Sequence, residues 1–263
     1  MLLEVKDLAI KYGNNAPTVS EINLTLDEGQ ILAIVGESGS GKTTVIRAIL
    51  GYIAGNGEIC NGDIFYKGKS LLSLSTKERR KMAGTNMSMI FQDSGNMINP
   101  VRKIGVQFED YILAHKKMSR IEANKKACKM LTKMRLANPK NIMNSYQFEL
   151  SGGMRQRIGI AMAMTFKPNI LLADEPTSAL DVTTQAQIVK QIIDIRDEDK
   201  TAVIIVTHNL GIASYMAKDI IVMKDGKIIE AGPREQIINH PQHEYTKELL
   251  ATVPIIGGKN YVD

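Results

Sequence analysis

The sequence contains little cysteine: only Cys60 and Cys128 occur among its 263 residues. The two cysteines lie far apart and lack the spacing of metal ligands, which favours reduced thiols and a cytoplasmic setting. An iron–sulfur cluster held by cysteines would normally need about four of them. The cysteine content therefore predicts a reduced protein without such a cluster.

Long apolar runs are also missing. None approaches the roughly 20 residues that a membrane-spanning helix requires. The amino terminus carries Glu4, Lys6 and Asp7 among its apolar residues, an alternation typical of a strand rather than of a secretory signal. Any role at a membrane therefore requires a partner protein. Internal repeats and low-complexity linkers are absent as well, so we expect a single composite domain over residues 1–263.

An excess of one charge is almost lacking. The chain has 33 Lys and Arg residues against 28 Asp and Glu residues, a net charge of +5. This mixed charge is better explained by solubility than by an anionic partner. One stretch, residues 115–140, is clearly basic, but lysines on a helical period usually form a solvated face. We therefore expect no nucleic-acid partner.

The 44% hydrophobic content is enough to bury a sizeable core, and its pattern changes along the chain. Residues 2–13 and 31–36 read as strands, and residues 41–53 read as a helix. Short β runs interrupted by glycine over residues 57–71 predict hairpins.

Residues 104–164 have mainly helical periodicity. After them, the stretches "NILLADEP", "QAQIVKQIIDIRDE" and "AVIIVTHN" alternate as strand, helix and strand, which is typical of a βαβ unit. The sequence therefore predicts an α/β fold whose parallel core is interrupted by a helical lobe.

The segment "GESGSGKT", residues 36–43, matches the pattern G-x-x-x-x-G-K-[ST] between a predicted strand and a predicted helix. Its glycines allow successive backbone N–H groups to face one anion, and the start of the helix adds its positive dipole end. Lys42 would reach the β- and γ-phosphates of a nucleotide, and Thr43 would offer its hydroxyl to Mg²⁺. A tight βα turn is the alternative, but the strand, lysine and threonine together favour a phosphate loop.

Two acids follow the apolar strand of "NILLADEP". Asp174 and Glu175 would then lie at the carboxyl edge of the sheet, where α/β proteins hold their ligands. An aspartate at this place supports Mg²⁺ in phosphate-loop enzymes, and Glu175 is placed to orient and deprotonate a water molecule. Capping of the next helix is the simpler alternative for both acids, and the phosphate loop favours nucleotide chemistry.

Two further polar residues end predicted strands. His208 follows "AVIIVT", and Gln92 follows "MSMIF". A lone histidine is more often structural than catalytic, but the strand edge favours contact with a γ-phosphate. The Gln92 amide is able to bond both a metal and an attacking water.

The stretch "ELSGGMRQRIGIAMAM" begins like a helix cap but has Gly152 and Gly153 in its first helical turn. Glycine there costs roughly 1 kcal/mol relative to alanine. Either two helices pack closely at this point, or a ligand approaches the bare backbone.

These motifs occur in the order found in the ATP-binding subunits of ATP-binding cassette (ABC) transporters, which the chain resembles from residue 2 to its carboxyl end. The resemblance implies a phosphate-loop NTPase fold of the ABC nucleotide-binding type, with an antiparallel β subdomain. It places a RecA-like core at residues 1–92 and 166–232, an inserted helical subdomain at 93–165, and a helical tail at 233–263.

The resemblance also implies ATP and Mg²⁺ as cofactors and assigns roles to residues. Tyr12 would stack on adenine, and Asp181 of "SALD" would link the two sites of a dimer. The ATP phosphates would lie on Gly36, Glu37, Ser38, Gly39, Ser40, Gly41, Lys42, Thr43 and Thr44. Glu175, His208 and Gln92 would be catalytic, Thr43, Gln92 and Asp174 would hold Mg²⁺, and Ser151, Gly152, Gly153 and Asp181 would contact the ATP of a second subunit.

Members of this family work with partners at the cytoplasmic face of the membrane. The implied partners are a related ATPase subunit in a heterodimer, two permease subunits and, indirectly, an external binding protein. Residues 93–108 resemble the lobe that grips a permease helix, and Met154 replaces the commoner glutamine.

The stretch "YQFELSGGMRQR" and the tail "HPQHEYTKELLATVP" resemble importers of peptides, nickel and metal chelates. The short tail and the low cysteine content favour nickel or a metal chelate. A di- or oligopeptide importer is the alternative, and a soluble ATPase without a transport role fits less well.

Overall fold

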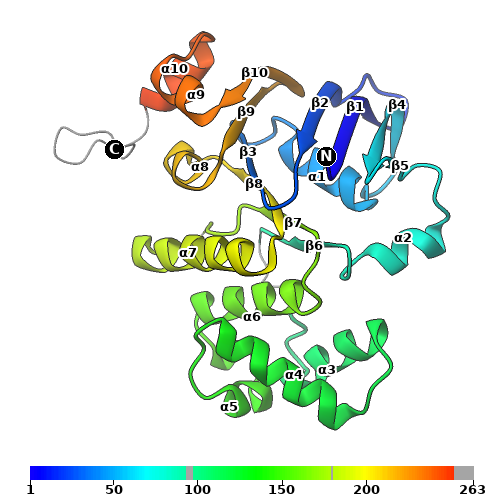
Figure 1. The fold of residues 1–263 in the computed structure, drawn as a ribbon, viewed down its shortest axis with the longest axis vertical. Helices are drawn as coiled ribbons and strands as arrows, with labels where there is room; N and C mark the ends of the chain where they lie inside the picture. Colours follow the sequence, from blue (N-terminus) through cyan, green and yellow to red (C-terminus); the bar gives the residue numbers. More distant parts are fainter. Residues whose placement is uncertain (93–96, 179, 252–263) are drawn as a thin grey trace. The chain divides into compact units, whose positions relative to one another are not determined.

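The computed structural model describes residues 1–92, 97–178 and 180–251, and the chain divides into two compact units (Figure 1). The first unit combines Met1–Arg80 with Lys200–Asp263, and the second unit is Lys81–Asp199. The second unit is therefore inserted into the first along the chain. The predicted boundary of the helical subdomain at residues 93–165 stays a prediction. The described residues do not include 93–96, at the start of this predicted subdomain, Ala179, or 252–263 in the predicted tail.

The first unit contains an antiparallel sheet with strand order β2-β1-β4-β5, seen in blue and cyan in Figure 1. Buried apolar residues alternate with exposed polar residues from Ile22 to Leu26 in β2, as expected for a strand with one buried face. The strands are β1 (Leu3–Tyr12), β2 (Val19–Leu26), β4 (Gly57–Tyr66) and β5 (Lys69–Ser70).

The glycine-punctuated stretch at residues 57–71 forms only one hairpin, in which Tyr66 of β4 lies opposite Lys69 of β5. The other expected turn does not exist, because Gly62 lies inside β4, which continues along β1. At φ 81°, Gly62 adopts a conformation that favours glycine, and a Cβ there would lie 2.3 Å from the carbonyl oxygen of Lys6. Gly62 therefore marks an irregularity of the ladder, not a chain reversal.

A second sheet in the first unit has the strand order β10-β9-β3-β8. Every residue of β3 (Ile31–Val35) and β8 (Ala202–Thr207) is buried, as uninterrupted apolar runs predict for parallel strands covered on both faces. β3 is parallel to both β8 and β9 (Asp219–Lys224), and β10 (Lys227–Pro233) closes the edge in the antiparallel direction.

Four helices accompany these strands among the described residues of the first unit, and a fifth, α2, begins there and ends in the second unit. Apolar residues of α1, including Val45, Ile46 and Ile49, are fully buried against the core. α9, drawn in orange in Figure 1, packs against β10. The helices are α1 (Lys42–Leu50), α2 (Thr76–Met82), α8 (Leu210–Met216), α9 (Arg234–Asn239) and α10 (Glu244–Ala251).

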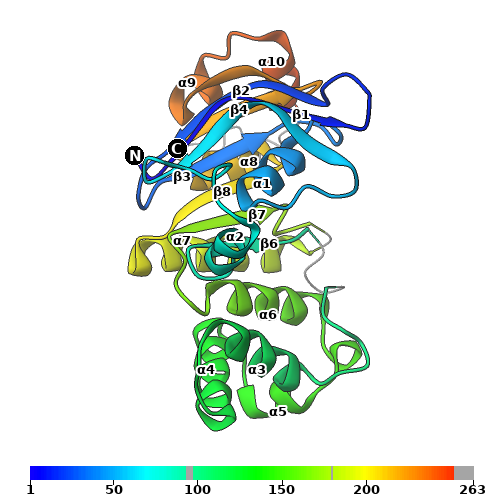
Figure 2. The same cartoon turned by 90° about the vertical axis from the view of Figure 1, so that its right-hand side faces the viewer.

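The second unit pairs two parallel strands, β6 (Met87–Ile90) and β7 (Ile170–Asp174), with Ile90 opposite Ala173. The remaining elements are helical, and Figure 2 shows several of them gathered in green. They are α3 (Ile104–His115), α4 (Arg120–Lys133), α5 (Pro139–Asn144), the 3-10 helix η1 (Gln147–Glu149), α6 (Gly152–Met164) and α7 (Val182–Asp199).

The helical part has its own core, in which Phe108, Ile112 and Leu131 are fully buried. α4 begins with a capping box: Ser119 accepts from the Glu122 amide, and the Glu122 carboxylate accepts from the Ser119 amide at 2.8 Å. The predicted α/β fold with an antiparallel sheet and a helical part is therefore confirmed.

Candidate functional site

The phosphate-loop motif connects β3 to α1 in the first unit. The ammonium group of Lys42 is buried under the loop and donates to the carbonyl oxygens of Gly36 at 2.8 Å and of Glu37 at 2.6 Å. It also donates to the Ser40 hydroxyl at 3.3 Å. The loop thus holds a positively charged group that is able to form strong hydrogen bonds to a phosphate.

Gly36 has a close neighbour as well as an unusual conformation. Its φ is 150°, and a Cβ at this position would lie 2.1 Å from the carbonyl oxygen of Met223 in β9. No other residue fits here without moving a backbone. The first glycine of the motif therefore lets the loop leave the sheet between neighbouring strands.

Strand register places His208 near the same sheet edge. Val35 lies opposite Thr207 in the parallel pair β3–β8, so Gly36 and His208 are the next residues of the two strands. His208 is exposed, while its neighbour Asn209 caps α8 by accepting from the Ile212 amide at 3.2 Å. The predicted placement at the carboxyl edge agrees with the register, and the γ-phosphate contact stays a prediction.

Tyr12 ends β1 and is half-buried. Its ring lies over Gly57 of β4, where a Cβ would come within 2.6 Å of a ring carbon. Part of the ring is therefore used in packing against β4. Stacking on adenine stays a prediction for the remaining exposed part.

In the second unit, the structure brings Gln92 and Glu175 together. The Gln92 amide donates to a carboxylate oxygen of Glu175 at 3.2 Å. The register of β6 and β7 explains this contact. Ile90 lies opposite Ala173, and Gln92 and Glu175 each lie two residues further along the chain. Asp174, the last residue of β7, is fully buried.

The backbone of Glu175 is strained. Its φ is 43°, in the left-handed region that a glutamate seldom adopts. Such conformations cost on the order of 1–3 kcal/mol and are concentrated at functional sites. The strain turns the chain sharply after β7, and Ser178 fixes the turn by donating to the Gln92 carbonyl at 3.2 Å.

The glycine pair of α6 separates into two different environments. Ser151 is the N-cap and accepts from the Met154 amide at 3.3 Å. A Cβ at Gly153 would lie 2.9 Å from the Thr184 methyl group of α7, so this glycine permits close packing. A Cβ at Gly152 would meet only Leu180, at 3.9 Å, and Gly152 is exposed. Packing within the unit therefore explains Gly153 but not Gly152.

Asp181 caps α7. Its carboxylate accepts from the Thr184 hydroxyl at 2.7 Å and from the Thr184 amide at 3.0 Å. These hydrogen bonds hold the pKa of Asp181 below its ordinary value. Capping of α7 thus accounts for the position of the Asp181 carboxylate, while the predicted link to a second subunit stays a prediction.

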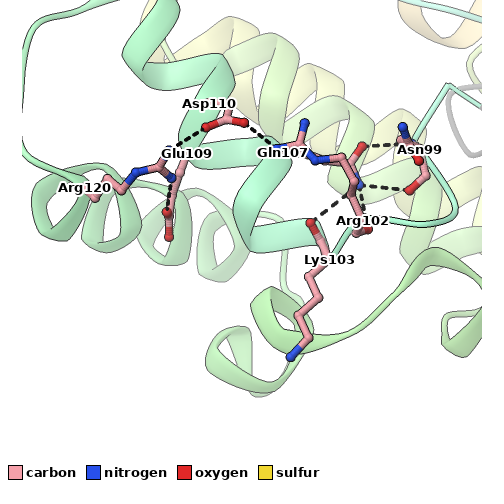
Figure 3. Close-up of polar contacts among 7 residues, drawn as sticks. All are labelled: Asn99, Arg102, Lys103, Gln107, Glu109, Asp110 and Arg120. Atoms are coloured by element: carbon pink, nitrogen blue, oxygen red, sulfur yellow. Dashed lines mark hydrogen bonds and ion pairs between the residues drawn. The ribbon is translucent and has the colours of Figure 1, made fainter.

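The loop that leads into α3 is held by one side chain, Gln107 (Figure 3). Its amide oxygen accepts from the Asn99 amide at 2.8 Å, and its amide nitrogen donates to the Asn99 carbonyl at 3.1 Å. The same nitrogen donates to the Arg102 carbonyl at 2.8 Å. The loop exposes two apolar side chains, Met97 (63% exposed) and Val101 (79% exposed).

A row of charges continues from this loop to α4 (Figure 3). Arg102 pairs with Asp110 at 2.6 Å, and Arg120 joins Asp110 to Glu109 with distances of 3.1 and 3.3 Å. The hydrogen bond from Arg102 holds the pKa of Asp110 below its ordinary value. Sequence reasoning missed both this row and the Gln107 contacts, and residue spacing carries no signal that would have revealed them.

None of the helices in the described parts of the chain is both long and apolar enough to cross a membrane. Within the same residues, no group of three or more His, Cys, Asp and Glu side chains could hold a metal ion by itself.

Comparison with known proteins places these features in context. Residues 19–178 match the family model described as ABC transporter. The chain is 42% identical over 259 residues to the oligopeptide transport ATP-binding protein OppD of Bacillus subtilis, with 97% of this chain and 72% of the relative covered. It is 39% identical over 254 residues to the metal-staphylopine import system ATP-binding protein CntD of Staphylococcus aureus, with 95% and 93% covered.

A solved structure is similar as well. The dimeric, post-hydrolysis state of the ATP-binding cassette MJ0796, bound to ADP and Pi, superposes with a TM-score of 0.78 and 28% sequence identity. The match covers 89% of this chain and 99% of that protein.

Proposed function

Because the chain belongs to the ABC transporter family and has the fold of its ATP-hydrolysing domain, we propose that it powers the import of di- or oligopeptides or of a metal chelate. The single observation that supports this best is the phosphate loop, in which a buried Lys42 ammonium lies among the loop's own oxygens. The ATPase activity belongs to the family, and the cargo and the residue roles are our proposal.

ATP would bind with its phosphates on the loop of residues 36–44. Lys42 would exchange its contacts with the Gly36 and Glu37 carbonyls for the β- and γ-phosphate oxygens. The amino terminus of α1 adds its positive dipole end to the same place. Tyr12 would support the adenine with the exposed part of its ring.

Mg²⁺ fits the donors that this chain offers. Thr43, Gln92 and Asp174 would supply a hydroxyl, an amide and a carboxylate oxygen, which are the hard ligands that Mg²⁺ prefers. Proteins usually hold Mg²⁺ through few side chains together with substrate phosphates, so a complete protein cluster is not needed. When bound, the ion neutralises charge on the β- and γ-phosphates.

Hydrolysis requires a water molecule aligned with the γ-phosphorus. We assign its alignment to Gln92 and Glu175, which already share a hydrogen bond, and Glu175 accepts the proton as the water oxygen bonds to phosphorus. The bond between the γ-phosphorus and the β–γ bridging oxygen breaks, and ADP and phosphate are formed. His208 would donate a hydrogen bond to a γ-phosphate oxygen.

A second subunit would complete each ATP site. The amino terminus of α6, with Ser151 as its N-cap, would face the γ-phosphate bound on the partner. The open space at Gly152 supports this arrangement, because nothing within the described residues of this unit requires a glycine there. Asp181 would contact the partner near the same place. We expect the partner to be a related but different ATPase subunit.

Gly152→Ala is expected to separate stability from activity. A methyl group fits at this exposed helical position, so the free energy of unfolding should rise by roughly 0.5–1 kcal/mol. The ATPase rate of the assembled transporter should fall on the order of 10²-fold, because the methyl group displaces the γ-phosphate from the helix. Thermal unfolding and a phosphate-release assay measure the two effects.

Gly153→Ala is the matched comparison. Here the added Cβ crowds Thr184, so the stability should fall. Both variants should bind ATP on their own phosphate loops with unchanged Kd. An unaltered ATPase rate in the Gly152→Ala transporter would show that the amino terminus of α6 does not take part in the ATP site.

We expect two permease subunits to anchor the ATPase peripherally at the cytoplasmic face of the membrane. The loop that carries Met97 and Val101 is our candidate contact, because it exposes apolar side chains and is held firmly by Gln107. Gln92 precedes this loop along the chain, which would connect the nucleotide state to the permease.

Two cargo classes are compatible with the relatives. OppD is named for oligopeptide transport, and the dipeptide transport protein DppD of Bacillus subtilis is also 42% identical over 257 residues. These names favour peptides as the first candidate. CntD, named for import of metal-staphylopine, supports a metal chelate as the second. Nickel, which the sequence analysis favoured, remains a special case of the second candidate.

Uptake by cells that lack this gene tests the cargo. We expect loss of labelled di- or oligopeptide accumulation, restored by the wild-type gene but not by a Lys42→Ala copy. Normal peptide uptake with lost accumulation of a metal chelate would instead support the second candidate. Normal uptake of both classes would contradict the proposed role in import.

A further inference from the structure

The peptide group of Glu37, inside the phosphate loop, is held from two sides. Its carbonyl oxygen accepts from the Lys42 ammonium at 2.6 Å. Its amide N–H donates to the hydroxyl of Tyr245 at 2.9 Å. Tyr245 belongs to α10 and lies 208 positions further along the chain. The Glu37 amide, although Glu37 was predicted among the phosphate contacts, is therefore bound by a side chain and not left for a phosphate.

The Tyr245 side chain has a fixed position. It is 7% exposed, and the Lys224 ammonium lies 4.6 Å from its ring centroid. Burial raises the pKa of Tyr245 above its ordinary value, so the hydroxyl stays protonated at neutral pH. The hydroxyl is thus a neutral acceptor that a rigid, buried ring presents to the loop.

The start of α10 is anchored to the sheet of the same unit. The Glu230 carboxylate in β10 accepts from the Gln242 amide at 2.8 Å and from the His243 amide at 3.1 Å. The Tyr245 amide donates to the His243 ring nitrogen Nδ1 at 3.1 Å. Because of these bonds, the position of the Tyr245 hydroxyl is set by β10.

Nucleotide binding would change the two sides of the Glu37 peptide unequally. When Lys42 turns to the β- and γ-phosphates, the Glu37 carbonyl loses its donor. The Tyr245 contact does not involve any phosphate ligand, so it is retained. ATP binding would therefore break the contact between Lys42 and the Glu37 carbonyl and keep the contact between the Glu37 amide and Tyr245.

We propose that Tyr245 is a positioning residue for nucleotide binding, which keeps the Glu37 peptide and hence the phosphate loop in its binding conformation when Lys42 moves to the phosphates. The proposal rests on the function proposed above. It assigns to α10 a role in the ATP site in addition to packing.

Tyr245→Phe in the full chain is the direct test, because it removes the hydroxyl and keeps the ring against Lys224. We expect the Kd for Mg-ATP, measured with a fluorescent ATP analogue, to rise about 3–10-fold, which corresponds to one lost hydrogen bond. Exchange of the Glu37 amide hydrogen, followed by NMR, should become faster. Tyr215→Phe in α8, where the side chain is 65% exposed, is the matched control and should change neither quantity.

A second variant covers the case in which Tyr245→Phe does not fold. Replacing Glu37 by its α-hydroxy acid analogue converts the amide to an ester and removes the N–H donor while Tyr245 stays intact. The same rise in Kd is expected, and adding Tyr245→Phe should cause no further rise, because both changes remove one interaction.

An unchanged Kd in either variant, or additive effects in the double variant, would overturn the proposal. A lower unfolding temperature with an unchanged Kd would leave Tyr245 only a packing role. The proposed function is tested separately by the wild-type chain: if it does not bind Mg-ATP, or if Lys42→Ala binds it equally well, the ATP site itself is wrong.

Discussion

Glu175→Gln is expected to slow ATP hydrolysis by the assembled transporter roughly 10²–10⁴-fold, the usual loss when a general base is removed. Glutamine has nearly the same shape. Its amide oxygen can keep the hydrogen bond that the Glu175 carboxylate accepts from the Gln92 amide at 3.2 Å. It cannot take a proton from water. ATP binding should therefore persist, and a dimer with ATP trapped in it should accumulate. Phosphate release and size-exclusion chromatography measure the two results.

Glu149→Gln provides a control for the loss of one carboxylate. Glu149 lies in η1 and accepts from the Tyr146 amide at 2.6 Å, outside the proposed ATP contacts. This variant should hydrolyse ATP at nearly the wild-type rate. An unaltered rate in Glu175→Gln would show that another group accepts the proton.

Lys42→Ala is expected to weaken ATP binding on this subunit by 10²-fold or more, since charged hydrogen bonds contribute about 1.5–3 kcal/mol each. Ser151→Arg should leave that site intact and weaken the site on the partner, because Ser151 caps the helix that faces the partner's nucleotide. Photocrosslinking of labelled ATP to each subunit of the heterodimer separates the two effects.

Lys69→Ala is the matched control for the lost lysine, because Lys69 is exposed in β5. It should change the labelling of neither subunit. If Lys42→Ala and Ser151→Arg weaken labelling of the same subunit, the site is formed within one chain and the proposed exchange between subunits is wrong.

The sequence was most informative where local pattern and tertiary environment agree. The apolar runs of β3, β7 and β8 are buried throughout, so the pattern alone identified the parallel strands. The register of such strands then accounts for the meeting of Gln92 with Glu175, which the sequence suggested only by placing both at strand ends.

Other features depend on contacts that no local pattern records. Gly62 looks like a turn residue, but its surroundings in β4 make it a bulge along β1. The neighbouring glycines of α6 are equivalent in sequence, and only their distances to Leu180 and Thr184 tell them apart. Tyr245 reaches Glu37 across 208 positions, a separation that periodicity and motif spacing cannot bridge.

The division of the first unit into two chain segments has a consequence for synthesis on the ribosome. β3 leaves the ribosome early, but its neighbours β8 and β9 lie roughly 170 residues later. At about 5–20 residues per second, the apolar β3 waits on the order of 10–30 s for its partners. Throughout this interval both edges of β3 lack their native hydrogen-bonded neighbours. The nascent chain must therefore be kept from pairing this strand with strands of other chains.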